Sequence, residues 1–209
     1  MNLDIDMRVL ELLCARLCHE LVGPVAAINN GVELLGEDDP DFVSDAVKLL
    51  GQSARKAGQR LQFYRFAYGS AASSGSKSAI IDPRALAAGL LEDGKVRCDW
   101  PAESVEGLAS EWQKLACNML VLAADALPRG GSVLVKQRPA GSPRITVTAE
   151  GTINFPEEQR AALGAGAAID ALTSRTVHAY FTARLALRLG APLTLAVEPQ
   201  ILVLAAPGA

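Results

Sequence analysis

The sequence has few aromatic residues and no long apolar run. Phe, Trp and Tyr make up 5% of its 209 residues, whereas half of the chain is apolar and consists mainly of Ala, Leu and Val. This composition favours helix-rich packing around a sizeable core. No apolar run reaches the ~18 residues of a membrane span, and the N-terminal MNLDIDMRV is acidic, unlike a secretory signal. We therefore expect a cytoplasmic protein without a membrane partner.

An excess of basic residues and a metal-binding cysteine pattern are also missing. The net charge is -3 and the pI about 5.5, which argues against a nucleic-acid partner because phosphate binding needs a concentrated basic surface. The four cysteines form no CxxC pair, so neither a zinc site nor a disulfide framework is indicated. Cys14 and Cys18 lie one turn apart beside His19, but a metal would need a further ligand. We expect no metal site and interpret the two cysteines as small packing residues.

The first third of the chain predicts two helices. Apolar residues at three- and four-residue spacing indicate a helix over residues 6–36 and a second from Asp39 to about Tyr68. Asp39 suits an N-cap and Pro40 the first helical position. Two helices cannot enclose a core alone, and this hairpin has apolar positions on more than one face. The pattern therefore predicts a homodimer in which two hairpins form a four-helix bundle.

A small, polar segment at residues 71–78 is the best linker in the chain. It separates the helical hairpin (1–70) from a second domain (79–209). In the second domain, the pattern predicts helices over 82–93, 105–127, 156–163 and 171–189 and strands over 95–100, 132–138, 144–150, 193–197 and 201–204. Helices alternating with mostly antiparallel strands indicate an α+β sandwich.

The most informative segment is CHELVGPVAAI, residues 18–28. His19 is one of only two histidines in the chain and is followed by Glu20. Pro24 falls inside the predicted helix at a cost of ~3 kcal/mol, because its ring clashes with the carbonyl of Glu20 and it lacks an N–H. A bend there would let the imidazole swing toward a partner. A lone histidine on a bundle surface needs no function, but the Glu-Leu pair and the misplaced proline favour a functional one.

This segment resembles the H-box of bacterial histidine kinases, roughly H-E-L-x-x-P-L-x-x-I. His19, Glu20, Leu21, Pro24 and Ile28 match it, and the two residues between Leu and Pro differ. The resemblance implies that His19 is the phosphorylated nucleophile and that Glu20 orients or deprotonates its ring. Histidine suits this role because one ring nitrogen attacks while the other carries a proton.

The second domain resembles the ATP-binding (Bergerat) domain of the same kinases, but in a degenerate form. Residues 118–123, NMLVLA, resemble the N-box, except that Leu122 replaces the asparagine that binds magnesium and has no oxygen to offer. Ala149 stands where the adenine-reading aspartate is expected, and Ile153 replaces a glycine. The segment 172–177, where a phosphate-framing glycine motif belongs, contains no glycine. We therefore expect no ATP binding and no cofactor.

A kinase-like hairpin joined to a degenerate ATP-binding domain resembles the ChpT family of bacterial histidine phosphotransferases over nearly the whole chain. The resemblance implies a phosphorelay in cell-cycle control. A phosphoryl group would pass from the receiver domain of a CckA-like hybrid kinase, through His19, to CtrA-like and CpdR-like response regulators. The receivers would supply the Mg²⁺.

A receiver must approach His19, so we expect it to contact the hairpin and also the second domain. The expected hairpin contacts are Leu21, Val25, Ile28, Ser53, Ala54, Ala57 and Leu61, with small residues such as Gly23, Ala26, Ala27 and Gly51 allowing close approach. Expected exposed contacts on the second domain are Arg160, Arg175, His178 and Tyr180. For Leu21 and Ile28, packing within the bundle is an equally good interpretation.

Two other functions compete with this one. An active histidine kinase would need the asparagine, aspartate and glycines that are missing. A non-catalytic pseudokinase adaptor would dock response regulators without needing His19, so substitution of His19 separates an adaptor from a phosphotransferase.

Overall fold

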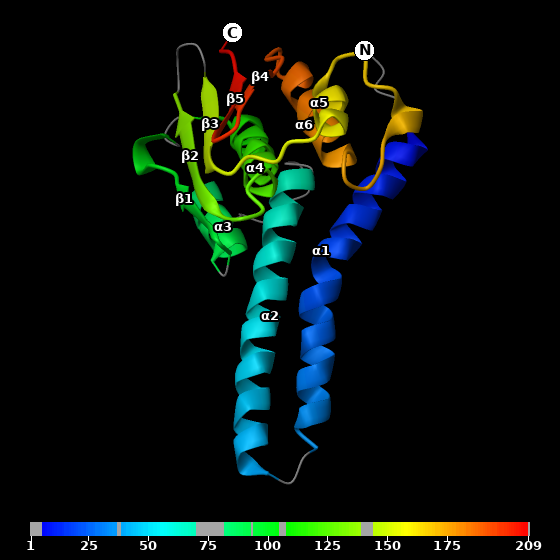
Figure 1. The fold of residues 1–209 in the computed structure, drawn as a ribbon, viewed down its shortest axis with the longest axis vertical. Helices are drawn as coiled ribbons and strands as arrows, with labels where there is room; N and C mark the ends of the chain where they lie inside the picture. Colours follow the sequence, from blue (N-terminus) through cyan, green and yellow to red (C-terminus); the bar gives the residue numbers. More distant parts are fainter. Residues whose placement is uncertain are drawn as a thin grey trace.

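The computed structural model describes residues 6–36, 39–69, 82–92, 94–104, 108–138 and 144–208. Helices α1 (Met7–Leu34) and α2 (Pro40–Tyr68) form an antiparallel hairpin (Figure 1). Asp6 and Asp39 cap the two helices through their side chains. Both predicted helices are confirmed, whereas the predicted linker 71–78 lies outside the described residues.

The second domain contains five strands and four α-helices among the described residues. Its elements are α3 (Pro83–Leu91), β1 (Val96–Asp99), η2 (Ala102–Ser104), α4 (Ser110–Asp125), β2 (Gly131–Gln137), β3 (Ile145–Gly151), α5 (Glu157–Leu163), η3 (Ile169–Ala171), α6 (Val177–Arg188), β4 (Thr194–Glu198) and β5 (Ile201–Ala206). The sheet order is β1-β2-β3-β5-β4, with β1 and β2 parallel and the other pairs antiparallel. The α+β fold class predicted from the sequence is confirmed.

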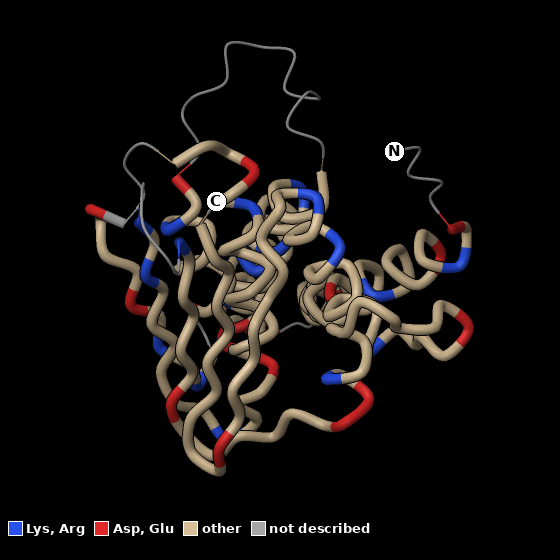
Figure 2. Tube along the Cα trace, turned by 90° about the horizontal axis from the view of Figure 1, so that it is seen from above, with Lys and Arg blue, Asp and Glu red and all other residues tan. Residues whose placement is uncertain are grey.

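The sheet packs one face against helices. Alternate residues of β2, β3 and β5 are buried on this face, among them Val133, Val147 and Leu204 at 0% exposure. Helices α4 and α6 cover it, and the opposite face carries no helix among the described residues (Figures 1 and 2). A Gly-Gly turn leads into β2: Gly131 has φ +153°, and a Cβ there would lie 2.2 Å from the carbonyl oxygen of Glu150.

Two helices begin later than their sequence patterns predict. Helix α6 begins at Val177 rather than at residue 171, because the Thr176 hydroxyl accepts a hydrogen bond from the Thr173 amide at 2.9 Å and stabilises a turn. Helix α4 begins at Ser110 rather than at residue 105, and residues 105–107 lie outside the described part of the chain.

The open end of the hairpin is embedded in the second domain. Phe63, Tyr64 and Ala67 of α2 are at most 3% exposed and belong to the same apolar core as Trp112 and Leu115 of α4. The closed end projects away from this core (Figure 1). The hairpin therefore has one end fixed to the second domain and one end free for other contacts.

Candidate phosphoryl-transfer site

His19 lies on α1 with an exposed side chain, and no described residue hydrogen-bonds to its ring. Helix α1 is continuous through Pro24 and changes direction about half-way along its length (Figure 1). This bend agrees with a proline inside a helix. At about 100° per residue, exposed Ala15, Val22 and Ala26 lie within about 60° of His19 around the helix axis. His19 therefore projects beside a strip of small and apolar residues, and Arg16, which pairs with Asp125, lies at a similar angle on its other side.

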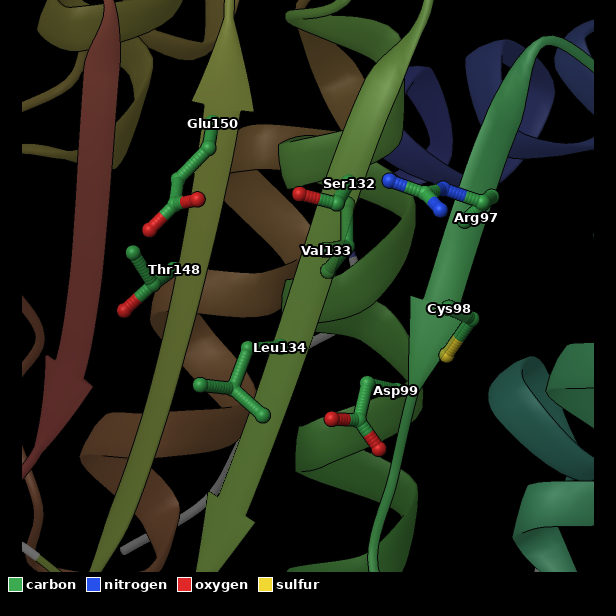
Figure 3. Close-up of a pocket in the computed structure, with 8 residues that line it drawn as sticks. All are labelled: Arg97, Cys98, Asp99, Ser132, Val133, Leu134, Thr148 and Glu150. Carbon is green, nitrogen blue, oxygen red and sulfur yellow. The ribbon is translucent and has the colours of Figure 1, made fainter.

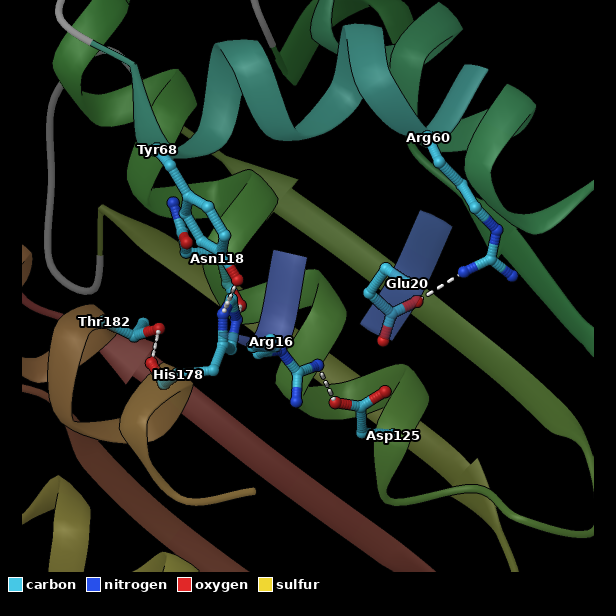
Figure 4. Close-up of polar contacts among 8 residues, drawn as sticks. All are labelled: Arg16, Glu20, Arg60, Tyr68, Asn118, Asp125, His178 and Thr182. Atoms are coloured by element: carbon cyan, nitrogen blue, oxygen red, sulfur yellow. Dashed lines mark hydrogen bonds and ion pairs between the residues drawn. The ribbon is translucent and has the colours of Figure 1, made fainter. Parts of the chain in front are cut away.

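An ion pair joins the two helices beside this strip. The Glu20 carboxylate pairs with the guanidinium of Arg60 on α2, and both side chains are only partly exposed (Figure 4). One turn before Glu20, Arg16 pairs with Asp125 at the end of α4, at 2.7 Å. Opposite charges therefore alternate across the junction of α1, α2 and α4. The i, i+4 spacing of Arg16 and Glu20 is a signal in the sequence, but nothing in it connects them with Arg60 or Asp125.

Buried aromatic groups lie next to these ion pairs. Burial raises the pKa of the Tyr68 hydroxyl to about 12, although nearby Arg16 opposes the shift. Burial also raises the pKa of Tyr64, and the charge of Glu20 adds to this effect. Both phenols therefore stay protonated at neutral pH and act as neutral groups.

Several predicted receiver contacts lie away from His19. Leu21, Val25 and Ile28 lie about 120–180° from His19 around the continuous helix. Ser53 is only 4% exposed and packs inside the hairpin, so it is not available to a receiver. Leu21, Val25 and Ile28 share one face of α1, but this face is not the one that carries His19.

The face opposite His19 is apolar and accessible in the single chain. On α1 it consists of Leu21, Val25, Ile28, Val32 and Leu35, and on α2 of Val43, Val47, Leu50, Ala54, Ala57 and Leu61, each set at alternating spacings of four and three. Val25, Val32, Val47 and Leu61 are 47–57% exposed. We call this set the apolar seam. Its spacing is that of the core positions of helical bundles.

In the second domain, two of the four predicted surface residues are buried. His178 is fully buried and Tyr180 is 8% exposed, whereas Arg160 and Arg175 are exposed. The prediction for His178 and Tyr180 was wrong because their burial depends on α6 packing against the sheet and the hairpin, which no local pattern reveals.

The residues that replace the kinase nucleotide ligands are also buried in the second domain. Leu122 is 2% exposed and Ala149 is fully buried. Asn118, which matches the first asparagine of the N-box, is fully buried, and its side-chain NH₂ donates to the carbonyl oxygens of Ala67 and Lys114. These three side chains offer no accessible oxygen to a metal–nucleotide complex. Among the described residues, no cluster of His, Cys, Asp or Glu is arranged to hold a metal ion.

A hollow lies on the sheet (Figure 3). Its lining comes from β1, β2 and β3 and consists of Arg97, Cys98, Asp99, Ser132, Val133, Leu134, Thr148 and Glu150. None of the residues predicted to act in phosphoryl transfer lines it. The candidate site is therefore an exposed helix surface suited to a protein partner.

Comparison with known proteins decides the family. Residues 81–201 match the family described as histidine phosphotransferase C-terminal domain. The chain is 34% identical to protein phosphotransferase ChpT of Brucella abortus (strain 2308), over 99% of this chain and all of that protein. The chain belongs to the ChpT family of phosphotransferases. A solved structure described as a bacterial phosphotransferase is 30% identical and superimposes with a TM-score of 0.78 over 99% of this chain and 98% of its own.

The family predicted from the sequence is therefore confirmed. The chain is related to phosphotransferases over both its hairpin and its second domain. None of the described helices is both long and apolar enough to cross a membrane.

Proposed function

We propose that this ChpT-family protein is a phosphorelay intermediate that carries the phosphoryl group on His19. The observation that carries the proposal is an exposed imidazole, on an H-box helix, with no competing hydrogen-bond partner among the described residues. Phosphoryl transfer depends mostly on positioning and charge stabilisation. A rigid helix that presents a free nucleophile meets the first requirement, and the Mg²⁺ of the receiver meets the second.

In the forward step, one ring nitrogen of His19 attacks the phosphorus of a receiver aspartyl phosphate. The N–P bond forms as the bond from phosphorus to the carboxylate oxygen breaks, which regenerates the aspartate. The proton on the other ring nitrogen stays there or passes to Glu20, whose carboxylate is held by Arg60. The reverse step loads the aspartate of the next receiver.

The receiver docks on the strip around His19, in this proposal. Ala15, Val22, Gly23 and Ala26 share this face and are exposed, and their small side chains allow a partner helix to approach closely. Gly23 and Ala26 were among the predicted small contacts. Leu21, Val25 and Ile28 are instead reassigned to the apolar seam.

The apolar seam supports a homodimer. Its 4-3 spacing on both helices matches the core positions of a four-helix bundle, and Val25, Val32 and Val47 are 47–57% exposed in the single chain. Two copies of the hairpin would cover both seams and place two His19 residues on outer faces. This also accounts for Ala54, Ala57 and Leu61, which lie on the seam.

We further propose that the protein binds no ATP and needs no cofactor of its own. Leu122 and Ala149 support this, because neither has a polar side chain and both are buried. The relay partners would be a CckA-like donor receiver and CtrA-like or CpdR-like acceptors, as in the cell-cycle role that the family resemblance implies.

The test is transfer of labelled phosphate from a phosphorylated receiver to the purified protein. Wild type should become labelled and His19→Gln should not, although both should fold and dimerise alike. An adaptor without relay activity would pass no label in either form and would still bind the receiver. Labelling of wild type by Mg-ATP alone would contradict the proposed absence of a nucleotide site.

A further inference from the structure

The last turn of α2 is held by side chains of the second domain. Asn118 Nδ2 donates a hydrogen bond to the carbonyl oxygen of Ala67 at 2.9 Å, and Lys114 Nζ donates to that of Gly69. The final carbonyls of a helix have no acceptor role within their own helix. Two side chains of α4 therefore cap the C-terminus of α2.

A buried histidine extends this contact to α6. His178 Nε2 lies 3.0 Å from the carbonyl oxygen of Asn118, and His178 Nδ1 lies 2.8 Å from the Tyr68 hydroxyl (Figure 4). A carbonyl oxygen only accepts, so Nε2 carries the proton and Nδ1 accepts from the Tyr68 O–H. This chain of hydrogen bonds fixes the tautomer of His178, which is fully buried, and joins α2, α6 and α4.

Helix α1 is fastened at two further points. The Arg8 guanidinium donates to the carbonyl oxygens of Ile169, Asp170 and Leu172 at 3.1–3.2 Å. Arg16 pairs with Asp125 three residues before His19. Both helices of the hairpin are thus tied to the second domain, and one tie lies a single turn from the nucleophile.

Apolar packing surrounds these polar contacts. Tyr68 meets Phe181 of α6 edge-on, with ring centroids 5.4 Å apart, and Phe63 and Tyr64 are buried beside them. Domains of one chain move relative to each other unless their interface is large and hydrophobic. Here one apolar core runs from the hairpin into the second domain.

We propose that Tyr68, Lys114, Asn118 and His178 form a latch that fastens the second domain to the phospho-accepting hairpin. Asn118 matches an asparagine of the kinase nucleotide motif. Helix α4, whose kinase counterpart contacts ATP, would here hold the hairpin and the second domain together. The latch goes beyond the proposed relay function, and its test requires no phosphoryl transfer.

Hydrogen exchange measured by mass spectrometry on the purified protein and its variants tests the latch. Tyr68→Phe keeps the ring and removes the donor to His178, so opening of this interface should become roughly tenfold more frequent. Exchange should therefore accelerate by about that factor in residues 64–69, whereas residues 44–52 near the closed end should stay unchanged. Tyr180→Phe removes a hydroxyl of α6 that takes no part in the latch and should change neither segment.

A double-mutant cycle measures the coupling between Tyr68 and His178 directly. In a His178→Leu background, Tyr68→Phe places two apolar groups together and should add much less exchange than it does alone. Lys114→Met, which removes the cap on Gly69, is the second variant if Tyr68→Phe does not fold. Unchanged protection of residues 64–69 in Tyr68→Phe and Lys114→Met would overturn the proposal. So would equal acceleration in both segments, because that means global destabilisation.

Discussion

Val32 provides a direct test of the apolar seam as a dimer interface. Its side chain is 56% exposed in the single chain. It lies 13 residues after His19 (19 to 32), or about 20 Å along a straight helix. A substitution at Val32 is therefore too distant to touch a phosphoryl group on the same chain, and any effect of Val32→Glu on association reports on the seam.

The expected magnitude follows from the exposed surface of Val32. Complete burial of a valine side chain contributes about 1.5–2 kcal/mol, so covering the exposed half contributes about 1 kcal/mol per copy and about 2 kcal/mol per symmetric dimer. Two buried glutamates add a desolvation cost of several kcal/mol. A total of at least about 4 kcal/mol raises the dimer Kd by at least about 10³-fold. In the monomer the site is on the surface, so the free energy of unfolding should change by less than about 0.5 kcal/mol.

Sedimentation velocity over a dilution series measures this change. Asn30→Glu is the matched control, because Asn30 is exposed on the same helix and points about 160° away from Val32. We expect Val32→Glu to sediment as a monomer at micromolar concentration and Asn30→Glu to remain dimeric. Indistinguishable dimer Kd values for the two variants, or a monomeric wild type, would refute the assignment.

Three further predictions concern the site and its surroundings. Glu20→Gln should slow phosphorylation of His19 by about 10²-fold in rapid-quench experiments if Glu20 takes up or orients the ring proton, and an unchanged rate would remove it from the mechanism. Ala26→Glu should weaken receiver binding in titration calorimetry and leave the dimer intact, whereas Ala54→Glu should dissociate the dimer. If Ala26→Glu dissociates the dimer and Ala54→Glu weakens receiver binding, the assignment of the two faces is wrong. Burial, with the nearby charge of Arg16, lowers the pKa of His178 to about 3, so below pH 6.5 the unfolded chain binds a proton that the folded chain does not. The free energy of unfolding should then fall by about 1.4 kcal/mol per pH unit from pH 6.5 toward 3, with a shallower slope in His178→Gln by denaturant titration.

Local sequence signals predicted the elements of the fold well. The Asp-Pro start of α2 and the three- and four-residue apolar spacing of α1 correspond to real caps and real helices. The start of α6 could not be placed in this way. Residues 171–176 are compatible with a helix by composition, and a hydrogen bond between Thr173 and Thr176 decides against it.

The candidate site was predicted only where chemistry is local. The segment that resembles the H-box lies within one helix, so the sequence could single out His19 and Glu20 as candidates, and their roles stay predictions. Arg60 and Asp125 are distant in sequence and meet α1 only through the tertiary fold. His178 shows the same limit, because its burial requires Tyr68 and Asn118 to arrive from two other helices.

Helix α1 carries His19 and the apolar seam on different faces, and this limits where receivers can bind. In the proposed relay, a donor and an acceptor receiver would each bring an aspartate to the same nitrogen of His19, so both would use the strip around His19 and could not bind one protomer together. The opposite face carries the apolar seam, which we propose is covered in the dimer, and the N-terminal turns contact the second domain through Arg8 and Arg16. The seam and the second domain thus leave only the strip around His19 for a receiver, and two receivers should compete for it. Saturation with one receiver should therefore raise the apparent Kd of a second in proportion to its concentration, and a ternary complex on one protomer would contradict the shared strip.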